Sequence, residues 1–135
     1  MKSRDTLIRL RRFQVDEKRR RVAQIEMMMA DFLRMATELD REVAQEEGRA
    51  GISDTAHFAY PTYARAAAGR RDNMRQSAAA LEGQLAEAKA ELGEAFEELK
   101  KVEILEDRER SAERAAEALR DQAAMDGIGL SRARA

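Results

Sequence analysis

Apolar side chains recur at every seventh position through the first third of the chain, and this spacing restricts the fold more than any other feature. The repeat runs from Ile8 to Val43, and no Pro or Gly interrupts residues 1–47. A seven-residue spacing keeps one face of a helix against a partner helix along its whole length. The members of this column are Ile8, Val15, Val22, Met29, Ala36 and Val43. The sequence therefore predicts a helix over about residues 4–47 that belongs to a coiled coil.

A second column of the same helix lies three positions after the first and is apolar only in its middle part. Its members are Arg11, Lys18, Ile25, Phe32, Leu39 and Glu46. The stems of Arg11 and Lys18 can lie on apolar neighbours while their charged heads reach water. We therefore expect the N-terminal end of the coiled coil to be packed less tightly than its middle.

A turn follows this helix, and a second long helix follows the turn. Gly48 is a residue type that ends helices, and residues 48–60 contain turn formers. Pro61 suits the first turn of a new helix, where its missing N–H needs no partner. The seam positions of that helix are Ala64, Ala67, Arg71, Met74, Ala78, Leu81, Leu85, Ala88, Leu92, Ala95, Leu99 and Val102. Only Arg71 among them is polar, so the pattern predicts a second helix over about residues 61–125.

The periodicity weakens toward the end of the chain. After Val102 the register slips, and a weaker apolar stripe continues through Leu105, Ala112, Ala116, Leu119 and Ala123. The sequence Asp-Gly-Ile-Gly at residues 126–129 predicts the end of the helix, and residues 126–135 are expected to form a frayed tail.

The charge distribution indicates how the two helices pair. Residues 1–21 carry nine Lys or Arg against three Asp or Glu, a net charge of +6, whereas residues 82–117 carry six against twelve, a net charge of −6. A short connection makes consecutive helices antiparallel neighbours, and this arrangement brings the two charged blocks together. The pairs expected are Leu39 with Met74, Phe32 with Leu81, Ile25 with Leu85 and Ile8 with Val102.

The predicted fold is therefore all-α and consists of one domain, residues 1–135. It is a long antiparallel two-helix coiled-coil hairpin with unequal helices. The second helix is expected to extend past the start of the first over about residues 106–125, since it is the longer of the two.

Composition and motifs exclude most enzyme chemistry. Charged residues make up 38% of the chain and aromatic residues only 4%, which is typical of long helices rather than of a compact core. The chain has no Cys, its single histidine is His57, and no Lys follows a Gly, so a thiolate site, a metal site and a phosphate-binding loop are not expected. No apolar run reaches the ~18 residues of a membrane span. We expect a cytoplasmic protein that is not an enzyme, binds no cofactor and does not insert into a membrane.

Two clusters are candidate contact surfaces. The basic run at residues 18–21, with Arg9, Arg11 and Arg12, is explained either by ion pairs to the second helix or by an acidic protein partner. Nucleic acid and membrane surfaces are weaker alternatives, because the basic residues face acidic ones and no aromatic residues alternate with them. The aromatic residues of the turn region either cover the helix junction or form a contact patch. They are Phe58, Tyr60 and Tyr63.

Three segments resemble the flagellar export protein FliJ in its alphaproteobacterial form. They are LIRLRRFQVDEKRRRVAQIE near the start, HFAYPTYARAA at the turn and EAFEELKKVE in the second helix. The resemblance implies a coiled-coil stalk of the flagellar type III export apparatus, located at the inner membrane of the flagellar base. It implies binding to the export ATPase hexamer, whose assembly it promotes, to the export gate membrane protein and to export chaperones.

The resemblance also assigns surfaces by region. The end facing the ATPase would comprise Arg9, Arg11, Arg12, Arg19, Arg20, Leu105 and Leu119. The hairpin end, facing the export gate, would comprise Phe58, Tyr60, Tyr63 and Met74. Two alternatives remain open, which are a general coiled-coil chaperone or scaffold and the equivalent component of a virulence-type secretion system.

Overall fold

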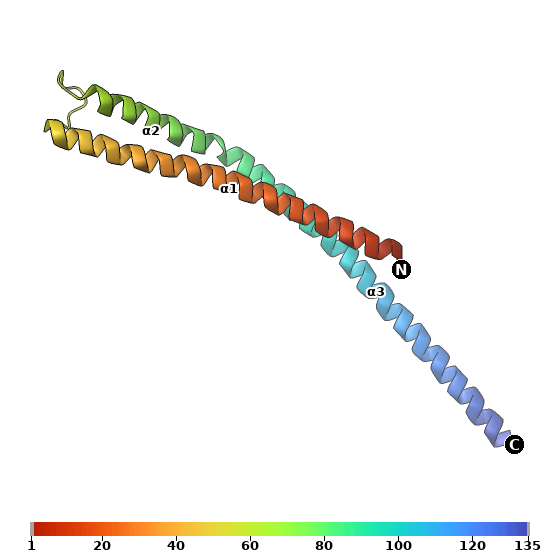
Figure 1. Ribbon diagram of the computed structural model, residues 1–135. Coiled ribbons are helices and arrows are strands. Elements are labelled where there is room, and N and C mark those ends of the chain that lie inside the picture. The colour runs from red at the N-terminus through yellow and green to blue at the C-terminus, as the bar shows by residue number, and fades with distance from the viewer. Residues whose placement is uncertain (1, 135) are drawn as a thin grey trace. The chain divides into compact units, whose positions relative to one another are not determined.

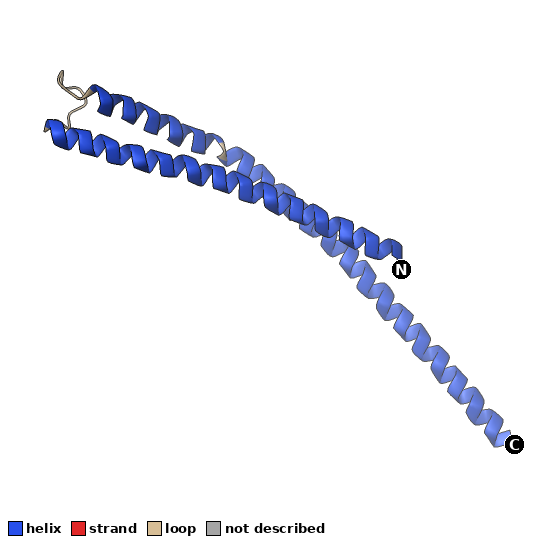
Figure 2. Ribbon diagram, in the orientation of Figure 1, coloured by secondary structure: helices blue, strands red, loops and turns tan. Residues whose placement is uncertain are grey.

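The structure is a computed structural model that describes residues 2–134, and these residues form three helices with no strand among them (Figures 1 and 2). Helix α1 spans Lys2–Ala50, α2 spans Thr62–Ala80 and α3 spans Glu82–Arg134. The all-α class is confirmed. The contacts of the chain divide it into two units, one formed by Met1–Val15 with Glu94–Ala135 and the other by Asp16–Gly93.

The unit Asp16–Gly93 is an antiparallel hairpin in which α1 packs on α2 and on the first turns of α3 (Figure 1). Its core contains the buried side chains Val22, Ile25, Leu81 and Ala88, with Met29, Phe32, Leu85 and Leu92 packed against them. Ile25 is the largest side chain that is fully buried. The pairs predicted for Phe32 with Leu81 and for Ile25 with Leu85 fall within this one cluster.

Near the turn the seam is made of small side chains. Ala64 and Ala67 of α2 are completely buried, and Ala36 and Val43 of α1 are buried as well. A methyl group fills little space, so the two helices lie close together at these positions. The core here is therefore a thin seam between two helices rather than a broad interior.

The unit formed by Met1–Val15 and Glu94–Ala135 is also antiparallel. Arg4 in the first turn of α1 forms ion pairs with Glu106 and Glu109 of α3. Val15 and Val102 are buried in the same unit. The heptad assignment is confirmed in both units, because every position assigned to the two columns of the first helix and to the seam of the second is buried or half-buried.

Helix α1 ends later than predicted, at Ala50 rather than near residue 47. Gly51, and not Gly48, takes the left-handed conformation with φ 70°, and its N–H donates to the Glu47 carbonyl at 2.9 Å. Glycine adopts that conformation without strain, so Gly48 and Gly51 were both possible residues to end the helix. The connection therefore runs over residues 51–61. Pro61 is the N-cap of α2, one residue before the first turn in which the sequence predicted it.

The predicted second helix is interrupted once, at Leu81. The Leu81 N–H bonds the Ala78 carbonyl three residues back at 3.1 Å, and the regular pattern resumes with Leu85 N–H to the Leu81 carbonyl at 2.9 Å. A tighter turn of this kind bends a helix where it occurs. Leu81 keeps its seam position in spite of the interruption and remains buried.

The C-terminal prediction differs from the structure. Helix α3 continues to Arg134, whereas the sequence indicated an end near residue 125 and a frayed tail over residues 126–135. Gly127 and Gly129 keep negative φ values, and Gln122 donates to Asp126 across one helical turn at 3.2 Å. Each glycine costs a helix only ~1 kcal/mol relative to Ala, which the Ala-rich surroundings tolerate.

Candidate partner-binding surfaces

A buried carboxylate ends the seam between α1 and α3. Glu106 is 5% exposed, and its Oε1 lies 2.9 Å from Arg110 Nε, while its Oε2 lies 3.7 Å from Arg4 Nη1 and makes no hydrogen bond. Charge burial is costly unless the charge is paired, and two guanidinium groups provide that pairing here. The sequence pattern predicts Leu105 in the continuing stripe, but in the structure Glu106 is buried at this level and Leu105 is exposed.

The predicted polar seam positions of α1 lie where expected, with one difference. Lys18 Nζ reaches Glu91 at 3.0 Å at the hairpin surface. Arg11 is half-buried and donates to Gln14 at 3.1 Å, but its Nε is buried without a hydrogen-bond partner. The guanidinium group of Arg11 is therefore only partly exposed to water. In this unit, Arg11 Nε and Glu106 Oε2 are both buried without a hydrogen-bond partner.

The basic residues predicted to contact the ATPase are distributed over both units. Arg9 and Arg12 are exposed beside Ile8 and Arg110, and the described residues include no ion-pair partner for either. Arg19 lies 3.8 Å from Asp16 one turn before it, and Arg20 is exposed. Arg9 and Arg12 thus present cationic groups to solvent at the start of α1.

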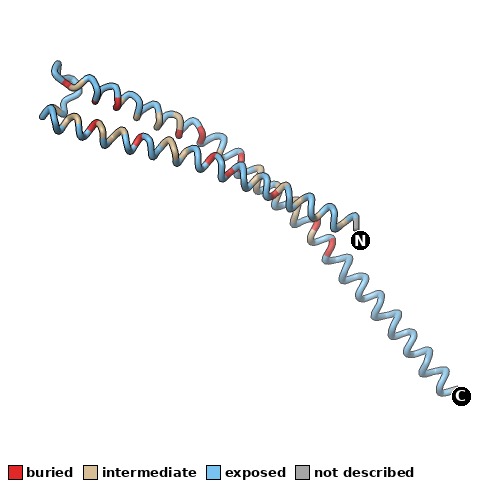
Figure 3. The backbone as a smooth tube through the Cα atoms, viewed as in Figure 1, coloured by how far each residue is buried: buried red, intermediate tan, exposed pale blue. Residues whose placement is uncertain are grey.

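The last half of α3 forms the most exposed surface. Every residue from 107 to 133 is exposed, as the pale blue end of the tube in Figure 3 shows. Leu105 is half-exposed and Leu119 is 72% exposed. The unpaired stretch predicted over about residues 106–125 is therefore longer in the structure.

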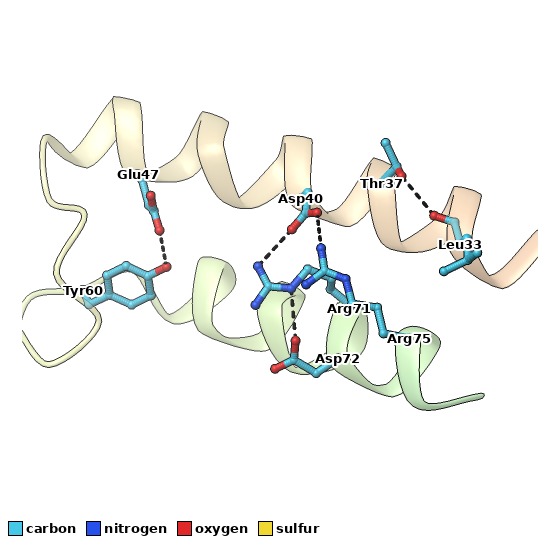
Figure 4. A network of polar contacts seen from close by, with 8 residues as sticks. All are labelled: Leu33, Thr37, Asp40, Glu47, Tyr60, Arg71, Asp72 and Arg75. Carbon is cyan, nitrogen blue, oxygen red and sulfur yellow. Dashed lines mark hydrogen bonds and ion pairs between the residues drawn. The ribbon is translucent and has the colours of Figure 1, made fainter. Parts of the chain in front are cut away.

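At the hairpin turn, Tyr60 is a structural residue rather than a surface one. It is 6% exposed, and its hydroxyl donates to the Glu47 carboxylate at 2.7 Å (Figure 4). The Arg65 guanidinium lies 5.3 Å from its ring centre. The hydrogen bond to Glu47 is the main cause that raises the pKa of Tyr60, with desolvation second. This tyrosine covers the helix junction, which was one of the two interpretations of the aromatic residues.

Phe58 and Tyr63 remain accessible. Phe58 is 96% exposed and stacks on His57, with ring centres 4.8 Å apart. Its loop is ordered by hydrogen bonds, since Asp54 Oδ1 accepts from the Ala56 N–H at 2.9 Å and the His57 N–H donates to the Asp54 carbonyl. Tyr63 is half-exposed and donates to Glu42 at 3.2 Å. Met74, the fourth residue predicted here, is half-buried in the seam.

Tyr60 supports a prediction about stability at high pH. A raised pKa means that the neutral phenol is favoured in the folded state, so its stabilisation is present below the ordinary tyrosine pKa of about 10 and is lost as pH rises past the raised value. Tyr60→Phe is expected to lower the melting temperature at pH 7, and this difference is expected to shrink above pH 10. Tyr63→Phe is the matched control, since its longer and more exposed contact should contribute less. An unchanged melting temperature for Tyr60→Phe at pH 7 would contradict the prediction.

An ionic network between α1 and α2 was not predicted from the sequence. Asp40 Oδ1 lies 2.9 Å from Arg71 Nη1, and Asp40 Oδ2 lies 2.6 Å from Arg75 Nη2, while Arg71 Nε also contacts Asp72 (Figure 4). The pKa of Arg71 is raised, and the largest cause is its hydrogen bond to Asp40. Arg71 is the single charged residue of an otherwise apolar seam. A charged residue at such a position could have indicated an acidic residue on the facing helix.

A second feature without a heptad signal is a group of exposed apolar residues outside the seam of α1. They are Met27, Met28, Leu33 and Met35. The seven-residue repeat says nothing about such positions, because it selects only the residues that face the partner helix.

Comparison with known protein families identifies a match over the whole chain. A family model described as "Flagellar FliJ protein" matches residues 1–135. Neither the curated proteins nor the solved structures contain a match to the chain. Over residues 2–134, no helix is both long enough and apolar enough to cross a membrane, and no group of three or more His, Cys, Asp or Glu side chains could hold a metal ion.

Proposed function

This chain belongs to the FliJ family, whose role lies in flagellum biogenesis and protein export, and from that premise we propose that it is the coiled-coil stalk of the type III export apparatus. The observation that carries the proposal is the family match over the whole chain. The antiparallel pairing of α1 with the helices that follow it supports the proposal. The stalk acts in the cytoplasm, next to the inner membrane at the flagellar base, and carries no catalytic site.

The first proposed partner is the export ATPase hexamer. Arg9, Arg12, Leu105 and Leu119 offer cationic and apolar groups that no other described residue covers, and Arg20 adds a further exposed cation. Arg11 in the first unit and Arg19 and Arg20 in the second are further proposed contacts of the ATPase. Exposed Arg side chains pair well with carboxylates on an acidic partner loop, and apolar side chains add contact area.

The second proposed partner is the export gate, with Phe58 and Tyr63 as its contacts. Rigid aromatic side chains are efficient anchors because they bury a large area at a small entropic cost. Tyr60 and Met74 act indirectly, because Tyr60 holds the helix junction and Met74 packs in the seam of α2. Export chaperones are a third proposed partner, and their handover of substrates occurs beside the gate.

The proposed mechanism follows from symmetry. A single chain inside a ring of six identical subunits cannot contact all six in the same way. Its contacts therefore favour some subunit conformations over others, and this differential affinity is what shifts a conformational equilibrium. Binding of the chain thereby promotes assembly of the hexamer and links its nucleotide state to the gate.

The experiment compares the hydrolysis rate and hexamer formation of the purified ATPase with and without this protein. Wild-type protein is expected to raise both, and the double variant Arg9→Glu, Arg12→Glu is expected to lose most of this effect by reversing two exposed charges. Arg41→Glu is the matched control, because Arg41 is also an exposed arginine of α1. If wild-type protein changes neither rate nor assembly, the ATPase part of the proposal is wrong.

One observation favours a second candidate function. The exposed apolar side chains Met27, Met28, Leu33 and Met35 resemble the adaptable surfaces of proteins that bind many clients. A general chaperone would suppress aggregation of unrelated unfolded proteins and would show no preference for the ATPase. A stalk would bind the ATPase preferentially and would not suppress aggregation of unrelated proteins. The corresponding component of a virulence-type system would bind the ATPase of that system in place of the flagellar one.

A further inference from the structure

The exposed half of α3 carries an apolar stripe that nothing in its unit covers. Six side chains share the stripe, and all six are exposed: Leu105, Ala112, Ala116, Leu119, Ala123 and Leu130. At 100° per residue they fall within an arc of about 60° and extend over roughly 38 Å of helix. From Ala112 to Ala123 they are spaced by four, three and four residues, and Leu105 and Leu130 each lie seven residues outside this run, which is the spacing of a coiled-coil seam.

We propose that this stripe pairs with the same stripe of a second copy, so that the chain forms an antiparallel dimer through residues 105–130 of α3. A two-fold interface of this kind uses one patch twice and therefore closes without forming fibres. With Leu105 opposite Leu130 of the second copy, Ala116 lies opposite Leu119, which is a small residue against a large one. The same register brings Ala112 opposite Ala123.

Charges beside the stripe fit this register. Glu113 and Arg120 each directly follow a residue of the stripe and therefore flank the seam, so Glu113 lies beside Arg120 of the second copy, two residues from direct opposition, and the two-fold symmetry repeats that favourable pair. A parallel dimer would instead bring together the basic first turns of α1, where Arg4 is paired to α3 and Arg9 and Arg12 are exposed. Repulsion between these like charges favours the antiparallel arrangement over the parallel one.

One pair of opposite residues in this register has like charges, and its replacement tests the proposed dimer. Glu109 lies opposite Asp126 of the second copy, and two carboxylates at a seam repel each other. Wild-type association is therefore concentration-dependent rather than permanent. Asp126→Leu removes the repulsion and adds apolar area at both ends of the interface, so the dissociation constant is expected to fall about tenfold or more.

The first experiment measures the mass of the full chain by light scattering or sedimentation over a range of concentrations. Wild-type protein is expected to rise from 15.3 kDa toward twice that mass. Leu119→Glu is expected to remain monomeric at every concentration. Met125→Glu is the matched control, since Met125 is 70% exposed but lies on roughly the opposite side of α3. Met125→Glu should dimerise over the same concentration range as wild type. Circular dichroism checks that both variants stay helical.

A second experiment tests orientation and uses the absence of cysteine from the chain. A mixture of Leu105→Cys and Leu130→Cys chains is expected to give the mixed disulfide on oxidation, while each variant alone gives little. Wild-type protein that stays monomeric, or Leu119→Glu that dimerises like wild type, would overturn the proposal. A predominance of Leu105→Cys homodimers would overturn the antiparallel arrangement.

The inference does not rest on the proposed function, because both experiments use the chain alone. The two are nevertheless connected, since Leu105 and Leu119 also belong to the surface proposed to bind the ATPase. A dimer covers these residues, so the dimer and the ATPase-bound form exclude each other. Wild-type protein that dimerises but does not stimulate the ATPase would count against the stalk proposal alone, and wild-type protein that stimulates the ATPase but never dimerises would count against the dimer alone.

Discussion

Ile25→Ala is expected to destabilise the protein by about 3 kcal/mol, because it removes the largest fully buried side chain from the core of the hairpin. A seam between two helices has no second layer that could move in to fill the space. The loss should therefore lie well within the range of ~2–5 kcal/mol measured for truncations of large aliphatic residues in protein cores. Chemical denaturation followed by circular dichroism gives the free energy of unfolding directly.

Met27→Ala serves as the control for this prediction. Met27 is two residues away on the same helix and is exposed, so its truncation should change the free energy of unfolding by less than ~0.5 kcal/mol. Equal losses for the two variants would mean that the core cluster around Ile25 does not exist in solution.

Glu106→Leu is expected to stabilise the protein by about 1–2 kcal/mol. Glu106 is a buried carboxylate at a seam position, and its pairing with Arg4 and with the exposed Arg110 must offset the cost of removing the carboxylate and much of the Arg4 guanidinium from water. Replacement of buried ionic groups by apolar residues of similar size is often stabilising, and in this variant Arg4 keeps its ion pair with Glu109. Removal of Arg4 instead leaves the buried carboxylate with Arg110 as its remaining partner. Arg4→Ala should therefore shift stability in the opposite direction, toward a lower free energy of unfolding.

The pair of variants distinguishes two roles for the carboxylate. If Glu106→Leu lowers stability as much as Arg4→Ala does, the ionic layer contributes net stability and the argument from desolvation is wrong. Glu109→Leu is a suitable control, because Glu109 also contacts Arg4 but is half-exposed. Its effect on stability should be small.

The heptad columns could be predicted from the sequence because they follow from one geometric condition. Ile25, Ala36 and Val43 must face the partner helix if a seven-residue repeat is to be buried at all, and the structure buries them. The antiparallel direction followed from the short connection and from the opposite charges, and Lys18 with Glu91 is an ion pair of the expected kind.

The helix ends and the local interruption could not be predicted in the same way. Gly48 and Gly51 are equivalent as residue types, and only the backbone conformation shows that Gly51 ends α1. The tight turn at Leu81 could not be predicted, because leucine is an ordinary residue for a seam position. The seam beyond Val102 was also misjudged, because Leu105 is apolar and exposed while Glu106 is charged and buried. Apolar character predicts burial only where no compensating charge is available.

The candidate surfaces were predictable as regions but not as individual side chains. The aromatic cluster was visible in the sequence, yet nothing in it distinguished Tyr60, which bonds Glu47, from Phe58, which faces solvent. The distinction depends on which ring can place its polar end near a carboxylate after the chain has folded.

The two alanines that close the seam near the turn have a consequence for how this chain can vary during evolution. Ala64 and Ala67 lie where the two helices touch, so any larger side chain there would have to push the backbones apart. Outward-facing positions on the same helix carry no such limit. A library of random substitutions screened for motile cells should therefore retain almost nothing but Ala, Gly or Ser at these two sites while accepting most residue types one position away.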